Sequence, residues 1–251
     1  MVVLNDEDRL TLRRFSDLEE LCQKRKSPQF SAFLDPKEVM LFEKVYKASP
    51  FVKTSAFGGF DDSERKVAGF FPDFWEEDLS EFPVSVIKIT GFGSYGHRDF
   101  LGSLLGLGIK RSTLGDIVIE GENGYVFALG SVCDFLMMNI TKIGRQNVKC
   151  ELLAPKDVII PPRQFDEIFG TVASLRLDAI VTLATRASRS KAVSLIEKEL
   201  VSVNWSPVTN PAKMVSEGDV LSVRGFGRVR IGEIYGESKK GRIKILLLAD
   251  K

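Results

Sequence analysis

Basic and hydroxyl side chains gather between residues 176 and 191 in a pattern suited to binding phosphate. Ser188 can cap a helix that runs to about residue 198, and Arg189 and Lys191 fall in its first turn. Cations at that position oppose the helix dipole, whereas the free backbone N–H groups of the turn attract an anion. A phosphate group would satisfy both, so the predicted chemistry is the binding of a polyanion.

The charge distribution along the chain also indicates a polyanion-binding region at the C-terminal end. The net charge of +1 combines residues 1–170, with 21 basic and 26 acidic side chains, and residues 171–251, with 14 and 8. The body is therefore acidic by five charges and the last third basic by six. A basic end on an acidic body is typical of proteins that bind nucleic acid, although a solvated charged surface explains the charge alone equally well.

Few residues have the types and spacing needed for catalysis or for a cofactor. His97 is the single histidine, which excludes a Ser-His-Asp triad and a zinc site built on histidines. Residues 91–96 fit the Gly-x-Gly-x-x-Gly pattern of dinucleotide binding, with Asp116 placed 20 residues beyond Gly96. A hairpin follows instead of a parallel strand, which favours a flexible loop. We expect no metal and no cofactor.

Composition gives the class of protein and its compartment. No segment approaches the ~20 apolar residues that span a bilayer, and the acidic N-terminus does not resemble a secretory signal. Cys22, Cys133 and Cys150 are far apart, which favours buried thiols in a reducing compartment over disulfides. We expect a cytoplasmic protein that does not enter a membrane and acts as a monomer.

The fold class predicted from the hydrophobic pattern is α+β, with three domains at 1–78, 79–160 and 170–251. The first has helices at 8–26, with Leu10, Phe15, Leu18 and Leu21 or Cys22 on one side, and at 36–47, followed by a strand pair at 51–57 and 66–71. The second has the order β-α-β-β-α-β of the ferredoxin-like fold, also used by RNA-recognition modules, with an Asn123-Gly124 hairpin. The third has helices at 179–183 and 188–198 and strands at 200–204 and 220–223.

The C-terminal domain resembles the S-four, or alpha-L, RNA-binding domain, named after the fourth protein of the small ribosomal subunit. The matching segments are Arg176-Leu177-Asp178, Ser188-Arg189-Ser190-Lys191-Ala192, Leu195-Ile196, 201–204 and 218–224. Glu199 at a helix end and Trp205 in a hairpin turn stand where the family usually has glycine. Neither departure removes a basic residue.

That resemblance implies which residues contact RNA. They are Arg176, Arg186, Ser188, Arg189, Lys191, Arg224, Arg228 and Arg230. Arg224, Arg228 and Arg230 would extend the surface along a strand. Because the dipole disfavours cations at a helix start, replacing Arg189 and Lys191 together by Ala is expected to leave stability unchanged or slightly raised, and to weaken RNA binding.

A second resemblance covers the whole chain. The run from Gly96-His97-Arg98-Asp99 to Ile109-Lys110-Arg111, closed by Gly115-Asp116-Ile117, is similar to the signature of the YlmH family. The family implies a middle RNA-binding domain and a C-terminal S-four domain, association with ribosomes, and a gene often found beside cell-division genes. It also implies rescue of stalled translation on the large ribosomal subunit carrying a tRNA.

The sequence therefore predicts a non-catalytic factor whose partners are ribosomal RNA, the large subunit and tRNA. His97, Arg98, Lys110 and Arg111 are a candidate second RNA patch, with a structural turn and solvated cations as the equal alternative. The competing function is an RNA-modifying enzyme, a pseudouridine synthase or methyltransferase, because S-four domains are often attached to such enzymes. Arg176-Leu177-Asp178 resembles part of a synthase active site, but here it opens the RNA-binding domain.

Overall fold

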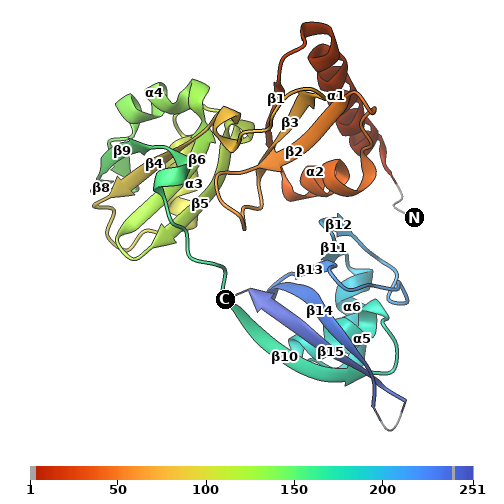
Figure 1. Cartoon of the computed structure of the whole chain (residues 1–251). Helices are drawn as coiled ribbons and strands as arrows, with labels where there is room; N and C mark the ends of the chain where they lie inside the picture. The colour runs from red at the N-terminus through yellow and green to blue at the C-terminus, as the bar shows by residue number, and fades with distance from the viewer. Residues whose placement is uncertain (1–3, 239–240, 251) are drawn as a thin grey trace. The chain divides into compact units, whose positions relative to one another are not determined.

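The chain folds into two compact units, Met1–Pro161 and Pro162–Lys251 (Figure 1). The computed structural model describes residues 4–238 and 241–250. Within these ranges no helix is long and apolar enough to cross a membrane. The first unit contains both of the domains predicted before residue 160, and the division at residue 78 stays a prediction.

The first unit begins with a three-stranded antiparallel sheet of order β1-β3-β2, packed against a long helix. Its elements are α1 Asp6–Arg25, β1 Gln29–Leu34, α2 Pro36–Met40, a π-helical turn Leu41–Val45, β2 Val52–Phe57 and β3 Lys66–Pro72. The predicted strand pair is confirmed, with Thr54 opposite Phe70. Strand β1 was not predicted, and the predicted helix at 36–47 is α-helical only as far as Met40.

Helix α1 buries the predicted face except at its first position, where Thr11 takes the place predicted for Leu10. Phe15 and Cys22 lie in the core as expected, but Thr11 is buried and Leu10 is 64% exposed. The helical repeat of 3.6 residues explains the difference, because positions 11, 15, 18 and 22 form one stripe and position 10 falls outside it.

The rest of the first unit has the predicted β-α-β-β-α-β order around an antiparallel sheet β5-β6-β4-β9. Its elements are a 3₁₀ turn Leu79–Glu81, β4 Val84–Thr90, α3 His97–Leu105, a 3₁₀ turn Arg111–Thr113, β5 Leu114–Glu120, β6 Asn123–Leu129, α4 Gly130–Asn139, the hairpin β7 Lys142–Ile143 and β8 Gln146–Asn147, β9 Lys149–Leu153, and a 3₁₀ turn Pro155–Asp157.

The tight hairpin between β5 and β6 turns two residues earlier than predicted. Glu120 pairs with Asn123, so Gly121 and Glu122 form the turn instead of Asn123 and Gly124. Gly121 has a φ of 56°, and glycine at the first central position is what a type II′ turn requires. Gly124 instead lies under the ring of Phe100, where an added Cβ would come within 2.5 Å of a ring carbon.

The two parts of the first unit share one apolar core. Phe33 and Phe71 from the first sheet pack with Val86 and Phe127 from the second. Gly115 at the start of β5 permits the approach, because a Cβ there would lie 2.6 Å from the ring of Phe33. This contact brings the 3₁₀ turn before β5 close to β1.

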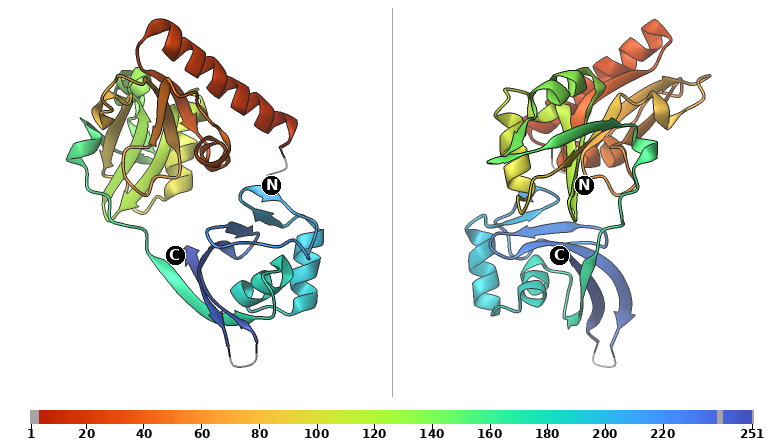
Figure 2. Two further views of the ribbon diagram at one scale, coloured as in Figure 1. Left: turned by 45° about the vertical axis from the view of Figure 1, so that its right-hand side comes forward. Right: turned by 90° about the vertical axis from the view of Figure 1, so that its left-hand side faces the viewer.

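The second unit is a six-stranded antiparallel sheet of order β10-β15-β14-β13-β11-β12 with two helices packed on one face (Figure 2). Its elements are β10 Phe165–Val172, α5 Leu177–Thr185, α6 Arg189–Glu197, β11 Val201–Val203, β12 Ser206–Pro207, β13 Val220–Val223, β14 Gly227–Glu237 and β15 Ile243–Asp250. The predicted helices and strands are present. Strands β10, β12, β14 and β15 were not predicted, and the expected domain start at residue 170 lies inside β10.

Glu199 and Trp205, which stand where the S-four family usually has glycine, adopt the left-handed backbone conformation that glycine favours. Glu199, after α6, has a φ of 57°, and Asn204 and Trp205 have φ values of 49° and 62°. Val203 pairs with Ser206, so Asn204 and Trp205 form a two-residue hairpin with the left-handed geometry of a type I′ turn. The turn is therefore unchanged, although it places side chains in a strained region.

Candidate RNA-binding surface

Asp178 organises the start of both helices in the second unit. Its side chain lies in the first turn of α5 and the residue is only 1% exposed. Arg176 donates from Nε to Oδ1 at 3.0 Å and from Nη2 to Oδ2 at 3.1 Å, while Arg189 donates from Nη2 to Oδ2 at 2.9 Å. These bonds, led by those of Arg176 and opposed by burial, lower the pKa of Asp178 to about 2.

The backbone at the start of α5 is occupied by another part of the chain. The N–H groups of Leu177 and Asp178 donate to the carbonyls of Lys213 and Pro211 at 2.8 and 3.0 Å. Arg176 also forms an isolated bridge with Met214. The start of α5 is therefore fixed from within the domain and does not present its N–H groups to an external anion.

The start of α6 is open to solvent. Ser188 caps the helix as predicted, with its Oγ 3.3 Å from the backbone nitrogen of Lys191. Residues 188–191 are all exposed, and Arg186 is an exposed residue at the end of α5 with a φ of 53°. The turn between the helices thus presents Arg186, Ser188 and Lys191 to solvent, and an N-terminal turn that can bind phosphate.

Arg189 has a second role that the sequence did not indicate. Its side chain is 67% exposed, yet its guanidinium group pairs with the buried carboxylate of Asp178. The cation that opposes the dipole of α6 is thereby compensated by a neighbouring helix. Arg176 and Arg189 both use Nε and Nη2 to bind Asp178, so each guanidinium group keeps further N–H groups that could donate to a phosphate.

The strand arginines do not continue the helical surface. Val229 and Ile231 point into the core beneath the helices, so strand alternation places Arg228 and Arg230 on the opposite face of the sheet. Arg228 pairs with Asp250 at 2.8 Å, and the guanidinium of Arg230 lies 5.8 Å from the ring centroid of Phe165.

Arg224 lies at the end of β13, where its backbone N–H donates to Leu200 at 2.9 Å. The side chain is exposed. It lines a shallow depression of about 390 Å³ together with Ser202, Ser222 and Arg228. Of the three predicted strand arginines, Arg224 and Arg228 therefore line a depression of their own, and Arg230 does not.

The candidate second patch in the first unit is divided by the structure. Arg98 and Lys110 are exposed, but Arg111 is half-buried and donates from Nη1 to the carbonyls of Leu114 and Gly115 at 2.7 and 3.1 Å. His97 is the first residue of α3, whose start is capped by Asp99. His97 is itself exposed, and partial desolvation of its ring together with the nearby Arg111 lowers its pKa.

The carboxylates that a dinucleotide site or a catalytic site would need are already engaged within the fold. Asp116, the carboxylate that a dinucleotide site would need, accepts from the backbone N–H groups of Glu64 and Arg65 at 2.6 and 3.2 Å. It fixes the loop before β3 onto β5. Asp178 is similarly occupied, because both of its oxygens accept arginine hydrogen bonds. Across residues 4–238 and 241–250, no three His, Cys, Asp or Glu side chains are grouped to hold a metal ion.

Comparison with known proteins agrees with this architecture. Residues 78–157 match the family model described as "Putative RNA-binding domain in YlmH", and residues 175–221 match the S4 domain. A Bacillus subtilis (strain 168) protein named "Ribosome-associated protein quality control protein P2" is 33% identical over 242 residues, covering 95% of this chain and 94% of the relative. The chain belongs to the YlmH family of RNA-binding proteins.

A solved structure supports the fold of part of this YlmH-family chain. The "Cell division protein ylmH from Streptococcus pneumoniae" superimposes with a TM-score of 0.53 at 23% identity, over 64% of this chain and 99% of that one. The predicted fold class and the predicted family are both confirmed by these comparisons and by the sheets described above. The individual RNA contacts stay predictions.

Proposed function

We propose that this YlmH-family protein is a non-catalytic factor that binds the large ribosomal subunit and acts in the rescue of stalled translation. The observation that carries the proposal is the Arg176–Asp178–Arg189 cluster, which fixes two guanidinium groups beside the open start of α6. Such an arrangement recognises folded RNA through its phosphates. Ribosomal RNA is the proposed principal ligand.

The finer parts of the proposal rest on the family. The name of the Bacillus subtilis relative supports association with ribosomes and a role in protein quality control. We propose that tRNA on the large subunit is a second contact and that the protein acts in the cytoplasm as a monomer. The name of the pneumococcal protein supports a connection with cell division, which we propose as a consequence of failed translation rescue.

Sedimentation through sucrose gradients tests the proposal. Full-length protein is mixed with purified small subunits, large subunits, and large subunits that carry a peptidyl-tRNA. We expect recovery with large subunits, increased by the tRNA and reduced by Arg176→Gln. Recovery only in the ribosome-free fraction, at low and moderate salt and with stalled complexes present, would contradict it.

The alternative of an RNA-modifying enzyme has a separate assay. Asp178 is the only residue that the sequence offered for catalysis, and its burial between two arginines favours a structural role. Ribosomal RNA is incubated with the protein and either a radiolabelled methyl donor or tritiated uridine in the RNA. Modification that depends on Asp178 while RNA binding persists would support the enzyme.

A further inference from the structure

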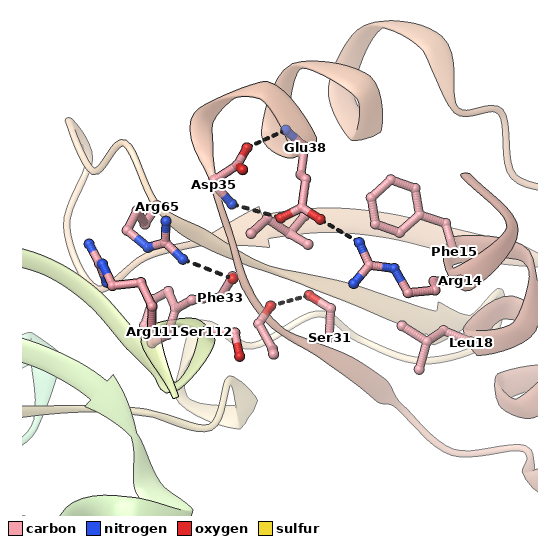
Figure 3. Close-up of a pocket in the computed structure, with 12 residues that line it drawn as sticks. Arg14, Phe15, Leu18, Ser31, Phe33, Asp35, Glu38, Arg65, Arg111 and Ser112 are labelled. Carbon is pink, nitrogen blue, oxygen red and sulfur yellow. Dashed lines mark hydrogen bonds and ion pairs between the residues drawn. The ribbon is translucent and has the colours of Figure 1, made fainter. Parts of the chain in front are cut away.

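A cavity of about 400 Å³ lies within the first unit, between β1 and the 3₁₀ turn that precedes β5 (Figure 3). Its lining includes Phe33 and Leu34, which are only 2% and 4% exposed, and the acids Asp35 and Glu38. One end is formed by Arg65 and Arg111. This size and this mixture of apolar walls with a few fixed polar groups are typical of small-molecule sites.

The two arginines are held side by side by a shared carbonyl. The oxygen of Leu114 accepts from Arg65 Nε at 3.0 Å and from Arg111 Nη1 at 2.7 Å. Arg65 Nη2 also donates to the carbonyl of Phe33 at 3.2 Å, and Arg111 Nη1 to that of Gly115 at 3.1 Å. Four hydrogen bonds to backbone carbonyls therefore fix both guanidinium groups, and Figure 3 shows them adjacent at one end of the cavity.

Acidic groups act on this pair as well: Asp35, Asp116 and Glu38 each stabilise the charge of Arg65, while burial opposes it. Burial lowers the pKa of Arg111 to about 10, the neighbouring Arg65 adds to the effect, and Asp116 opposes it. At the other end of the cavity, Glu38 pairs with Arg14 and caps the backbone of Asp35. Holding two guanidinium groups together costs free energy that an anion between them would recover.

We propose that Arg65 and Arg111 bind the phosphate group of a nucleotide, with the rest of the nucleotide in the adjoining cavity beside Phe33 and Leu34. Guanidinium groups bind phosphate oxygens in pairs, and carbonyl contacts hold both forks in place in advance. The nucleotide is either free or part of an RNA strand. The site lies in the first unit and does not depend on the RNA-binding surface of the second.

The test is a titration of the full-length protein labelled with ¹⁵N-arginine, in which NMR follows the Nε–Hε groups at constant ionic strength. The probes are inorganic phosphate, AMP, and a short single-stranded RNA. The variants are Arg111→Gln and Arg111→Lys, with Arg13→Gln as the matched control because Arg13 is an exposed cation of the same unit that does not line the cavity. Lys191→Ala reports on the second unit separately.

AMP is expected to shift the Arg65 and Arg111 resonances at lower concentration than phosphate does. Arg111→Gln should weaken AMP binding about tenfold or more, and Arg111→Lys less, because Lys keeps the charge without the fork. Arg13→Gln and Lys191→Ala should leave AMP binding unchanged. Shifts with AMP support a free nucleotide, and shifts with RNA alone support an RNA nucleotide.

Two results would overturn the proposal. One is that neither phosphate, AMP nor RNA shifts the Arg65 and Arg111 resonances in the wild-type protein. The other is that Arg111→Gln, confirmed as folded by its thermal melt, binds AMP as tightly as the wild type and Arg13→Gln do. Ribosome binding through the second unit would be unaffected by either result, so the two proposals fail separately.

Discussion

Arg189 in the first turn of α6 donates two hydrogen bonds to one carboxylate oxygen of Asp178 in the first turn of α5, at 2.9 and 3.2 Å. A residue expected from sequence to be a free RNA contact is therefore also a link between two helices. This relationship changes the expected outcome of its substitution.

Arg189→Ala should lower both stability and RNA affinity. It leaves Asp178 with Arg176 as its remaining guanidinium partner, and we expect a loss of about 1 kcal/mol in the free energy of unfolding, since the exposed guanidinium is screened by water. Lys191→Ala is the matched control and should weaken RNA binding without changing the melt. Urea unfolding and RNA titrations on both variants measure this. Equal stability of the two variants would mean that the ion pair contributes nothing.

The link should also make stability depend on pH. The pKa of Asp178 is lowered to about 2 in the folded protein, against ~3.9 in an unfolded chain. Its contribution, on the order of 2 kcal/mol, is therefore fully present above pH ~4 and is lost as the pH falls towards 2. The stability difference between wild type and Asp178→Asn should shrink over that range in urea titrations. A constant difference would contradict it, and Glu197→Gln, an exposed acid in α6, is the control.

The second unit should reach its full stability alone only if all of β10 is included. Residues 165–170 pair with residues 245–250 of β15, and a fragment that begins at residue 170 would leave most of that edge unpaired. We expect residues 162–251 to unfold cooperatively and to bind ribosomal RNA. Residues 170–251 should melt at a lower temperature or not fold. Identical melts for the two fragments, measured by circular dichroism, would show that the missing half of β10 is dispensable.

RNA binding should be strongly salt-dependent. The basic excess of residues 171–251 and the exposed start of α6 indicate about four to six phosphate contacts, which predicts a slope of about −3 to −5 for log K against log salt. Lys191→Ala should reduce the slope by about one. Fluorescence titrations between low and moderate salt test this, and a slope near zero would rule out an electrostatic interface.

Much of the local structure follows from the sequence because it depends on neighbouring residues. Asp35 and Ser188 cap their helices as their positions predicted, and the apolar periodicity indicated α1, α3 and α4. The order of helices and strands along the middle segment was also predicted from the sequence, because each apolar run there ends at a recognisable turn. The short strand β1 was missed, and so were β14 and β15 of the second unit, although their burial alternates along the strand.

The sequence by itself determined the family, the basic C-terminal end and which cations were candidates. Only the tertiary structure decided what each cation does. Asp178 lies 11 residues from Arg189, and Arg65 lies 46 residues from Arg111, so neither relationship appears in any local pattern. Hydrogen bonds between side chains depend on distances set by packing, such as the approach that Gly115 allows between β5 and Phe33. The sequence therefore gives the candidate residues, and the packing of the folded chain determines which of them form hydrogen bonds with one another.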